Sequence, residues 1–152
     1  MTEPGGVKVI LVGDDGSAGA ERAIAFAAAL ASQLDAEVVL VKAYSPLDEL
    51  GRAEPPVDFK ALRDRESERL DAERCKQFND AGVRSRVLLI ENPDAIGVLA
   101  RTADDVEADL VVVGSHGQSG WRGRILGSVA TKLPHELRCP ITIVPAPRTR
   151  SG

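Results

Sequence analysis

Aromatic residues are scarce in this 152-residue chain: they make up 3% of it, although hydrophobic residues as a whole reach 43%. The core must therefore consist of Val, Leu, Ile and Ala, which suits helices packed on a sheet of aliphatic strands. The length fits one domain, and the chain holds no internal repeat, linker or low-complexity tract. We predict a single domain over residues 1–152, with its core at about 7–146.

Cysteine, histidine and long apolar runs are also rare. Cys75 and Cys139 are far apart and form no CxxC pair, so the pattern indicates reduced, packed thiols and no zinc site. No apolar run approaches the roughly 20 residues that span a bilayer, and the N-terminus lacks the pattern of a signal peptide. We expect a cytoplasmic protein without a membrane partner.

Positive charge is not in excess, since the net charge is −4 and the isoelectric point is about 5.2. A basic field suited to nucleic acid is absent, so we expect no nucleic-acid partner. Residues 110–135 nevertheless contain no Asp or Glu and carry Arg122, Arg124 and Lys132. A local cationic segment in an acidic protein points to a phosphate-bearing small molecule.

Five short apolar segments alternate with helical patterns along the chain. The expected strands are Val7–Val12, Glu37–Ala43, Val83–Ile90, Leu110–Val113 and Ile141–Val144. Proline on both sides of the last segment favours an edge position for it. The alternation predicts an α/β fold, a doubly wound five-stranded parallel sheet with helices on both faces.

The ends of three helices can be predicted from their residue types. Ser17 is expected to cap the first helix, and Asn92 to cap the third with Pro93 at its first position. The last helix is expected from about Ser128, and Pro134 should kink or shorten it.

The second helix is expected over Phe59–Ala81 and is dense in charged residues. Apolar residues are sparse in it, and Gly82 follows as a C-cap signal. We interpret its charges as a solvated face with pairs between residues i and i+4.

Two glycine-rich loops follow predicted strands, Gly13–Ser17 and Gly114–Gly127. Ligands of doubly wound sheets bind beyond the carboxyl ends of the strands, where strand order reverses. If both loops serve one ligand, the first and fourth strands must be neighbours. Asp14 and Asp15 in the first loop either form the turn or accept hydrogen bonds from an adenine or ribose.

The second loop, GSHGQSGWRGRILG, has fourteen residues and five of the chain's fourteen glycines. Such loops usually have about 2–6 residues, and longer ones are often functional. Glycine lets backbone N–H groups gather round an anion, and the loop leads into a helix N-terminus that attracts phosphate. The alternative, that the glycines only permit tight turns, stays open. The loop is neither a Walker A motif nor a dinucleotide fingerprint.

The spacing Gly114-x2-Gly117-x9-Gly127-Ser128 resembles the ATP-binding pattern of the universal stress protein family. The stretches VGDDGS, VLVKA, ENPDAI, ADLVVVGSHG and CPITIVPA agree with it, so the resemblance covers essentially the whole chain. It implies a Rossmann-like fold of the adenine nucleotide alpha hydrolase type, with ATP at the switch point and Mg²⁺ held through the phosphates.

The resemblance also implies roles for residues on the base side of the ligand. Asp15 would approach the adenine or ribose, Gly13 and Asp14 would line the adenine side, and Ala43 would touch the base through its backbone. Position 43 often holds a larger aliphatic residue in the family, so the adenine would pack more loosely here.

On the phosphate side, the resemblance places Gly114 and Gly117 near the ribose and phosphates. Gly127, Ser128 and Val129 would cradle the phosphates with backbone N–H groups. Ser115 and His116 lie between the first two motif glycines, and His116 is either a phosphate donor or a partly exposed loop residue.

Three functions follow as alternatives. The first is a nucleotide-binding regulator in the stress response, commonly a homodimer through the last strand, here Ile141–Val144. The second is a slow ATPase or phosphotransferase, and the third is a dimeric interaction module without nucleotide. We find no obvious catalytic base beside the phosphate loop, so we assign no catalytic residue and no metal ligand, and expect weak ATP hydrolysis at most.

Overall fold

A computed structural model describes residues 6–44, 58–116 and 126–147. The strands are β1 (Val9–Gly13), β2 (Glu37–Tyr44), β3 (Ser85–Glu91), β4 (Leu110–Gly114) and β5 (Ile141–Val144). The helices are α1 (Ala18–Leu34), α3 (Phe59–Asp80), α4 (Ala95–Asp105) and α5 (Ser128–Lys132), with a 3₁₀ turn at Leu133–His135. All five predicted strands are present, with ends that differ by up to two residues.

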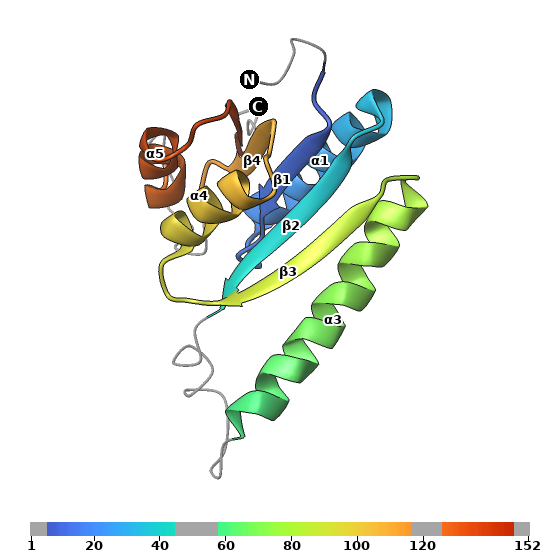
Figure 1. Cartoon of the computed structure of the whole chain (residues 1–152), viewed down its shortest axis with the longest axis vertical. Coiled ribbons are helices and arrows are strands. Elements are labelled where there is room, and N and C mark those ends of the chain that lie inside the picture. Colours follow the sequence, from blue (N-terminus) through green and yellow to red (C-terminus); the bar gives the residue numbers. More distant parts are fainter. Residues whose placement is uncertain (1–5, 45–57, 117–125, 148–152) are drawn as a thin grey trace, which may run out of the picture.

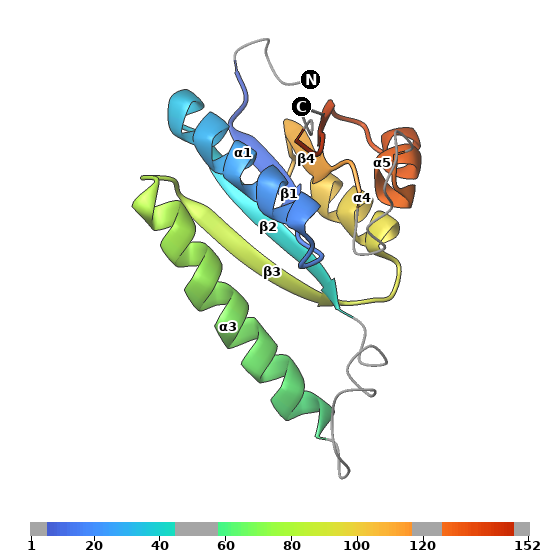
Figure 2. The ribbon, with the colours of Figure 1, turned by 180° about the vertical axis from the view of Figure 1, so that it is seen from behind.

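The strands form one parallel sheet in the order β3-β2-β1-β4-β5, with helices on both faces (Figures 1 and 2). This confirms the predicted doubly wound sheet, the edge position of β5 and the adjacency of the first and fourth strands. The N-terminal parts of β1 and β4 are in register, with Ile10 opposite Leu110 and Val12 opposite Val112.

Two aliphatic cores lie on the two faces of the sheet, because neighbouring residues of a strand point to opposite faces. On one face, Ile10, Val12 and Leu40 pack against α1 and α3. On the other, Leu11 and Val39 pack against α4 and the segment that begins with α5. Among the buried side chains of these cores only Phe78 is large and aromatic, as the composition predicts.

Several predicted helix ends are confirmed. The Ser17 hydroxyl accepts a hydrogen bond of 3.1 Å from the N–H of Ala20 at the start of α1. Gly82 follows α3 with a φ of +71°, a left-handed conformation that glycine adopts without strain. The α-helical part of the last helix ends at Lys132, and Pro134 lies in the following 3₁₀ turn.

The predicted cap of α4 is wrong. Asp94, not Asn92, caps this helix, because its carboxylate accepts a hydrogen bond of 3.0 Å from the N–H of Gly97. The Asn92 side chain instead accepts one of 2.8 Å from the N–H of Asp94. Asn92 thus forms a turn ahead of the helix, and Pro93 lies within that turn.

Candidate functional site

The two glycine-rich loops meet where strand order reverses. The chain leaves β1 for β2 on one side and passes from β4 to β5 on the other. The carboxyl ends of β1 and β4 therefore point to the same edge of the sheet, side by side. This is the place where doubly wound proteins bind ligands.

The first loop is held by its own carboxylates. Asp14 Oδ1 accepts a hydrogen bond of 2.9 Å from the N–H of Gly16, and Asp15 Oδ1 accepts one of 2.9 Å from the N–H of Ser17. The N–H of Asp14 donates to the carbonyl of Val41 on β2, also at 2.9 Å. The turn-forming role considered for both aspartates is thus present in the structure.

The second loop is closed at its base by backbone contacts. Ser115 is buried, its N–H donates to the carbonyl of Val144 at 3.0 Å, and its carbonyl accepts from the N–H of Gly127 at 2.7 Å. The Ser115 hydroxyl lies 3.0 Å from Nδ1 of the partly exposed His116. The strand end and the start of α5 are therefore joined directly.

Gly114 has a packing role in this closure. A Cβ at Gly114 would lie 2.7 Å from the backbone of Gly19, and a Cβ at Gly19 would meet the carbonyl of His116. The first turn of α1 thus packs tightly against the end of β4, where only glycine fits on both sides.

The start of α5 offers backbone donors to an anion, but the N–H of Gly127 is not among them. Gly127 is the N-cap, and the first helical hydrogen bond runs from the N–H of Thr131 to the Gly127 carbonyl at 3.0 Å. The N–H groups of Ser128, Val129 and Ala130 precede that bond, as at every helix start. The N–H of Gly127 already bonds Ser115, which corrects its expected role as a phosphate donor.

A pocket of about 230 Å³ lies between these loops. Every described residue of the predicted site lines it: Gly13, Asp14, Asp15, Ala43, Gly114, Ser115, His116, Gly127, Ser128 and Val129. Gly117 is outside the described residues, as are Trp121, Arg122 and Arg124.

Sequence reasoning missed part of the pocket wall. Val41, Leu99 and Val113 give it an apolar side, and Ser17, Ala20, Ala95 and Ala130 complete it. Strand alternation could have revealed Val41, because it lies on the same face of β2 as Ala43. The pocket thus combines an apolar wall with backbone donors at one end, as expected of a site for a base with a phosphate.

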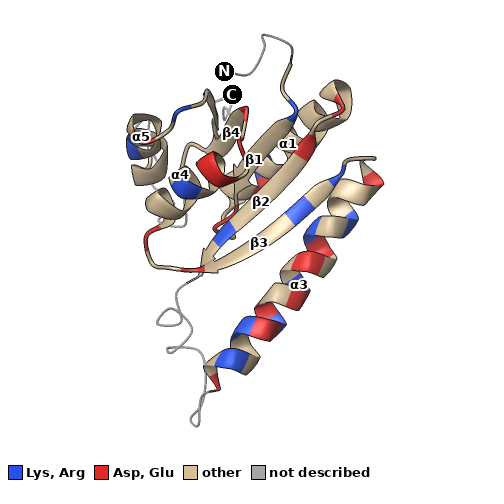
Figure 3. Ribbon diagram, in the orientation of Figure 1, with Lys and Arg blue, Asp and Glu red and all other residues tan. Residues whose placement is uncertain are grey.

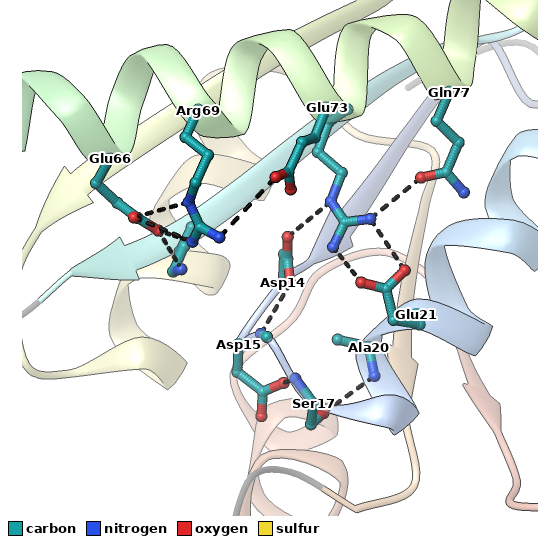
Figure 4. Close-up of polar contacts among 12 residues, drawn as sticks. Asp14, Asp15, Ser17, Ala20, Glu21, Glu66, Arg69, Glu73 and Gln77 are labelled. Atoms are coloured by element: carbon teal, nitrogen blue, oxygen red, sulfur yellow. Dashed lines mark hydrogen bonds and ion pairs between the residues drawn. The ribbon is translucent and has the colours of Figure 1, made fainter.

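A second missed feature is the partner of Asp14 (Figure 4). The Asp14 carboxylate is only 2% exposed, and its Oδ2 accepts a hydrogen bond of 3.0 Å from Arg74 Nε on α3. The same guanidinium donates to both carboxylate oxygens of Glu21, at 3.0 and 2.5 Å, and to Gln77 at 3.1 Å. Hydrogen bonds from Arg74 lower the pKa of Glu21, and those to Glu21 raise the pKa of Arg74.

This network corrects part of the interpretation of α3. Charged residues occur along the whole of α3 (Figure 3) and most of them are exposed. Lys60–Asp64 and Lys76–Asp80 are the expected i,i+4 pairs. Arg74, however, is buried. Glu66 is half-buried, and its Oε1 lies 2.6 Å from Nζ of Lys42 on β2. Both occupy positions in the helix stripe that faces the sheet.

The described residues offer neither a metal cluster nor a membrane span. Nowhere in the described ranges do three His, Cys, Asp or Glu side chains come together to hold a metal ion. Within the same ranges no helix is long and apolar enough to cross a membrane.

Comparison with known proteins agrees with this architecture. The family model described as "Universal stress protein family" matches residues 6–145. The chain belongs to the universal stress protein family. A universal stress protein of Mycobacterium tuberculosis is 37% identical over 138 residues, covering 88% of this chain and 44% of the relative. The chain therefore spans less than half of the length of that relative.

Other members match over nearly their full length. A universal stress protein of Thermus aquaticus is 36% identical over 139 residues, covering 90% of this chain and 98% of its own. Among solved structures, a universal stress protein in complex with cAMP is 26% identical with a TM-score of 0.65, covering 91% of this chain and 97% of that one.

Proposed function

We propose that this protein binds an adenine nucleotide, with ATP as the principal ligand, in the pocket between the two glycine-rich loops. The observation that carries the proposal is the convergence of the described motif residues, Gly114, Gly127 and Ser128, on one pocket at the switch point. The cAMP complex of the 26% identical structure supports an adenine nucleotide as the class of ligand.

The base and ribose would occupy the apolar end of the pocket. Val41, Leu99 and Val113 supply aliphatic surface there, and Gly13 leaves room beside Leu99. Asp15 lines the same pocket from the first loop and would accept a hydrogen bond from the base or ribose. With the base against the apolar wall and Asp15 beside it, the ribose would lie between the two loops.

The phosphates would lie at the start of α5. The backbone N–H groups of Ser128 and Val129 and the Ser128 hydroxyl are donors at this end of the pocket. Because the described residues provide no cluster of ligating side chains, Mg²⁺ would be held through the phosphates of ATP. In that role the ion would offset negative charge on the nucleotide.

We further propose that binding, not turnover, is the main role, so that the nucleotide regulates the protein in a stress response in the cytoplasm. The second copy of a homodimer would pair along β5, whose residues Ile141–Val144 are all half-buried at the sheet edge. An unpaired strand edge is a ready surface for such pairing.

Calorimetric titration of the purified protein with ATP and Mg²⁺ tests the proposal, with AMP, cAMP and GTP in parallel. We expect saturable binding of ATP near one per chain and much weaker binding of GTP. Binding of AMP without ATP would contradict the phosphate assignment. Absence of saturable binding with every nucleotide would contradict the proposal as a whole.

A further inference from the structure

Arg74 connects α3 to the first loop of the pocket, although its own side chain does not line the pocket. Its Nε donates to Asp14 at 3.0 Å, while its two terminal nitrogens hold Glu21 on α1. The guanidinium therefore links three elements: α3, α1 and the turn that follows β1. Figure 4 labels its partners Asp14, Glu21 and Gln77.

Asp14 connects Arg74 to the turn that lines the pocket. One carboxylate oxygen accepts from Arg74, and the other accepts from the N–H of Gly16 within the turn. The backbone of the same residue is fixed to Val41 of β2. Asp15 and Ser17, which flank Gly16, both line the pocket. A shift of the Asp14 carboxylate would therefore move pocket-lining residues.

The position of Arg74 in its helix is one that an apolar side chain could also fill. Leu62, Glu66, Leu70, Arg74 and Phe78 follow one another at intervals of four, and so share one face of α3. Leu70 and Phe78 are buried in the core on either side of Arg74. Replacing a buried ion pair by apolar residues is often neutral or stabilising, so an apolar side chain would serve packing equally well.

We infer that Arg74 is a positioning residue of the nucleotide site, which holds the turn Asp14–Ser17 in its binding geometry from outside the pocket. The inference rests on the proposed nucleotide binding. Since coupling between two sites is reciprocal, a bound nucleotide also acts back on Arg74 and α3.

The test separates positioning from stability with a pair of variants. Arg74→Met alone leaves the buried Asp14 carboxylate without its cation and should lower the midpoint of thermal unfolding. Adding Asp14→Asn removes that unpaired charge and keeps an oxygen for the N–H of Gly16. The double variant should recover most of the midpoint, yet bind ATP about tenfold more weakly than Asp14→Asn alone, which shares its change in a pocket-lining residue.

Leu70→Ala is the matched control. Leu70 is one turn away on the same helix face, and its apolar side chain belongs to the core, whereas Asp14 and Glu21 are bonded by Arg74. The control variant should lower the unfolding midpoint and leave ATP affinity within twofold of wild type, measured below that midpoint. An equal loss of affinity in Leu70→Ala would overturn the inference, because general destabilisation would then explain both effects.

NMR of the wild type distinguishes a positioning role from a purely structural one, because a purely structural Arg74 would keep its resonance unchanged when nucleotide binds. The Arg74 Nε–H resonance should shift when ATP saturates the protein, since its acceptor belongs to the pocket turn. An unshifted resonance in a protein that binds ATP, or equal affinity in the double variant and in Asp14→Asn alone, would overturn the role of Arg74. Failure of the wild type to bind any nucleotide would instead be the failure of the proposed function.

Discussion

The backbone N–H of Gly127 donates a hydrogen bond of 2.7 Å to the carbonyl of Ser115. The end of β4 and the start of α5 are thus joined by a backbone hydrogen bond. This bond fixes Ser128 and Val129 beside Asp15 and Ala43 in one pocket. It also uses the Gly127 N–H, so under the proposed nucleotide binding the phosphate donors would come from the residues that follow Gly127.

Ser128→Pro should weaken ATP binding without unfolding the protein. Proline is favoured at the first position of a helix, and Gly127 has the extended conformation (φ −65°, ψ 171°) that a residue before proline prefers. The change removes one N–H and one hydroxyl, and hydrogen bonds to charged groups contribute about 1.5–3 kcal/mol each. We expect affinity for ATP to fall at least about tenfold by calorimetry, the loss that corresponds to one such bond at the lower end of this range.

Two comparisons complete this experiment. Ser128→Ala removes only the hydroxyl and should cost less affinity than proline does. Adenosine, which has no phosphate, should bind the proline variant as it binds the wild type. If ATP binds the proline variant as tightly as the wild type, the phosphates do not lie at the start of α5.

Substitution of Gly13 should block the opposite end of the pocket. A Cβ at Gly13 would lie 3.3 Å from both terminal methyl groups of Leu99 and 3.8 Å from Val113, so further atoms would enter the space assigned to the base. Gly13→Ala should reduce adenosine affinity slightly, and Gly13→Val should reduce it at least about tenfold, as overpacking costs about 1–3 kcal/mol. A Gly13→Val variant with unchanged adenosine affinity would place the base elsewhere.

Gly19→Ala should destabilise the protein even though Gly19 is in an α-helix. Replacing a helical glycine by alanine normally stabilises by up to about 1 kcal/mol. Here the added Cβ would meet the His116 carbonyl, and relieving such a contact costs about 1–3 kcal/mol. Urea unfolding should therefore show a lower free energy of unfolding. Ser32→Ala, on the exposed side of the same helix, should change it by less than about 0.5 kcal/mol.

Acid should destabilise the protein through two carboxylates, Glu66 on α3 and Glu21 on α1, which are both paired with cationic side chains. Burial raises the pKa of Glu66, but hydrogen bonds from Arg69 and Lys42 outweigh this and hold it below 4.5, and Arg74 lowers the pKa of Glu21. A lowered folded-state pKa means stabilisation that is complete above the unfolded pKa and is lost as pH falls through the folded pKa. The free energy of unfolding should thus decline below about pH 4.5.

Glu66→Gln tests the source of that decline. The variant has no carboxylate to protonate at this position, so its free energy of unfolding should fall less steeply between pH 5 and pH 3 than that of the wild type, measured at intervals of about 0.5 pH unit. Glu68→Gln, exposed on the same helix, should behave as the wild type does. Equal slopes for Glu66→Gln and wild type would show that the Lys42–Glu66 pair is not responsible.

The sheet could be predicted from the sequence because its signals are local. Aliphatic runs such as Leu110–Gly114 are buried on both faces and read as strands without further context. The adjacency of β1 and β4 was predicted on the condition that the two glycine-rich loops serve one ligand. The predicted site converged for the same reason, since its residues lie at strand ends that the topology brings together.

The role of Arg74 could not be predicted in the same way. A helix with so many charges has no clear apolar face, and the partner carboxylates Asp14 and Glu21 are distant in sequence. The interval of four that joins Leu70, Arg74 and Phe78 is the one local signal. Helix caps are similarly ambiguous, because Asn92 and Asp94 are both capping residue types and only geometry decides between them.

Chemical-shift mapping with ATP and Mg²⁺ on ¹⁵N-labelled protein tests the central claim most directly. The amide resonances of Asp15 and Ala43 at one end of the pocket, and of Ser128 and Val129 at the other, should shift together and saturate at one nucleotide per chain. Amides on the exposed side of α1, such as Ser32, should stay in place. Saturable shifts confined to residues outside the pocket, or no shifts at all, would contradict the assignment of this pocket as an adenine nucleotide site.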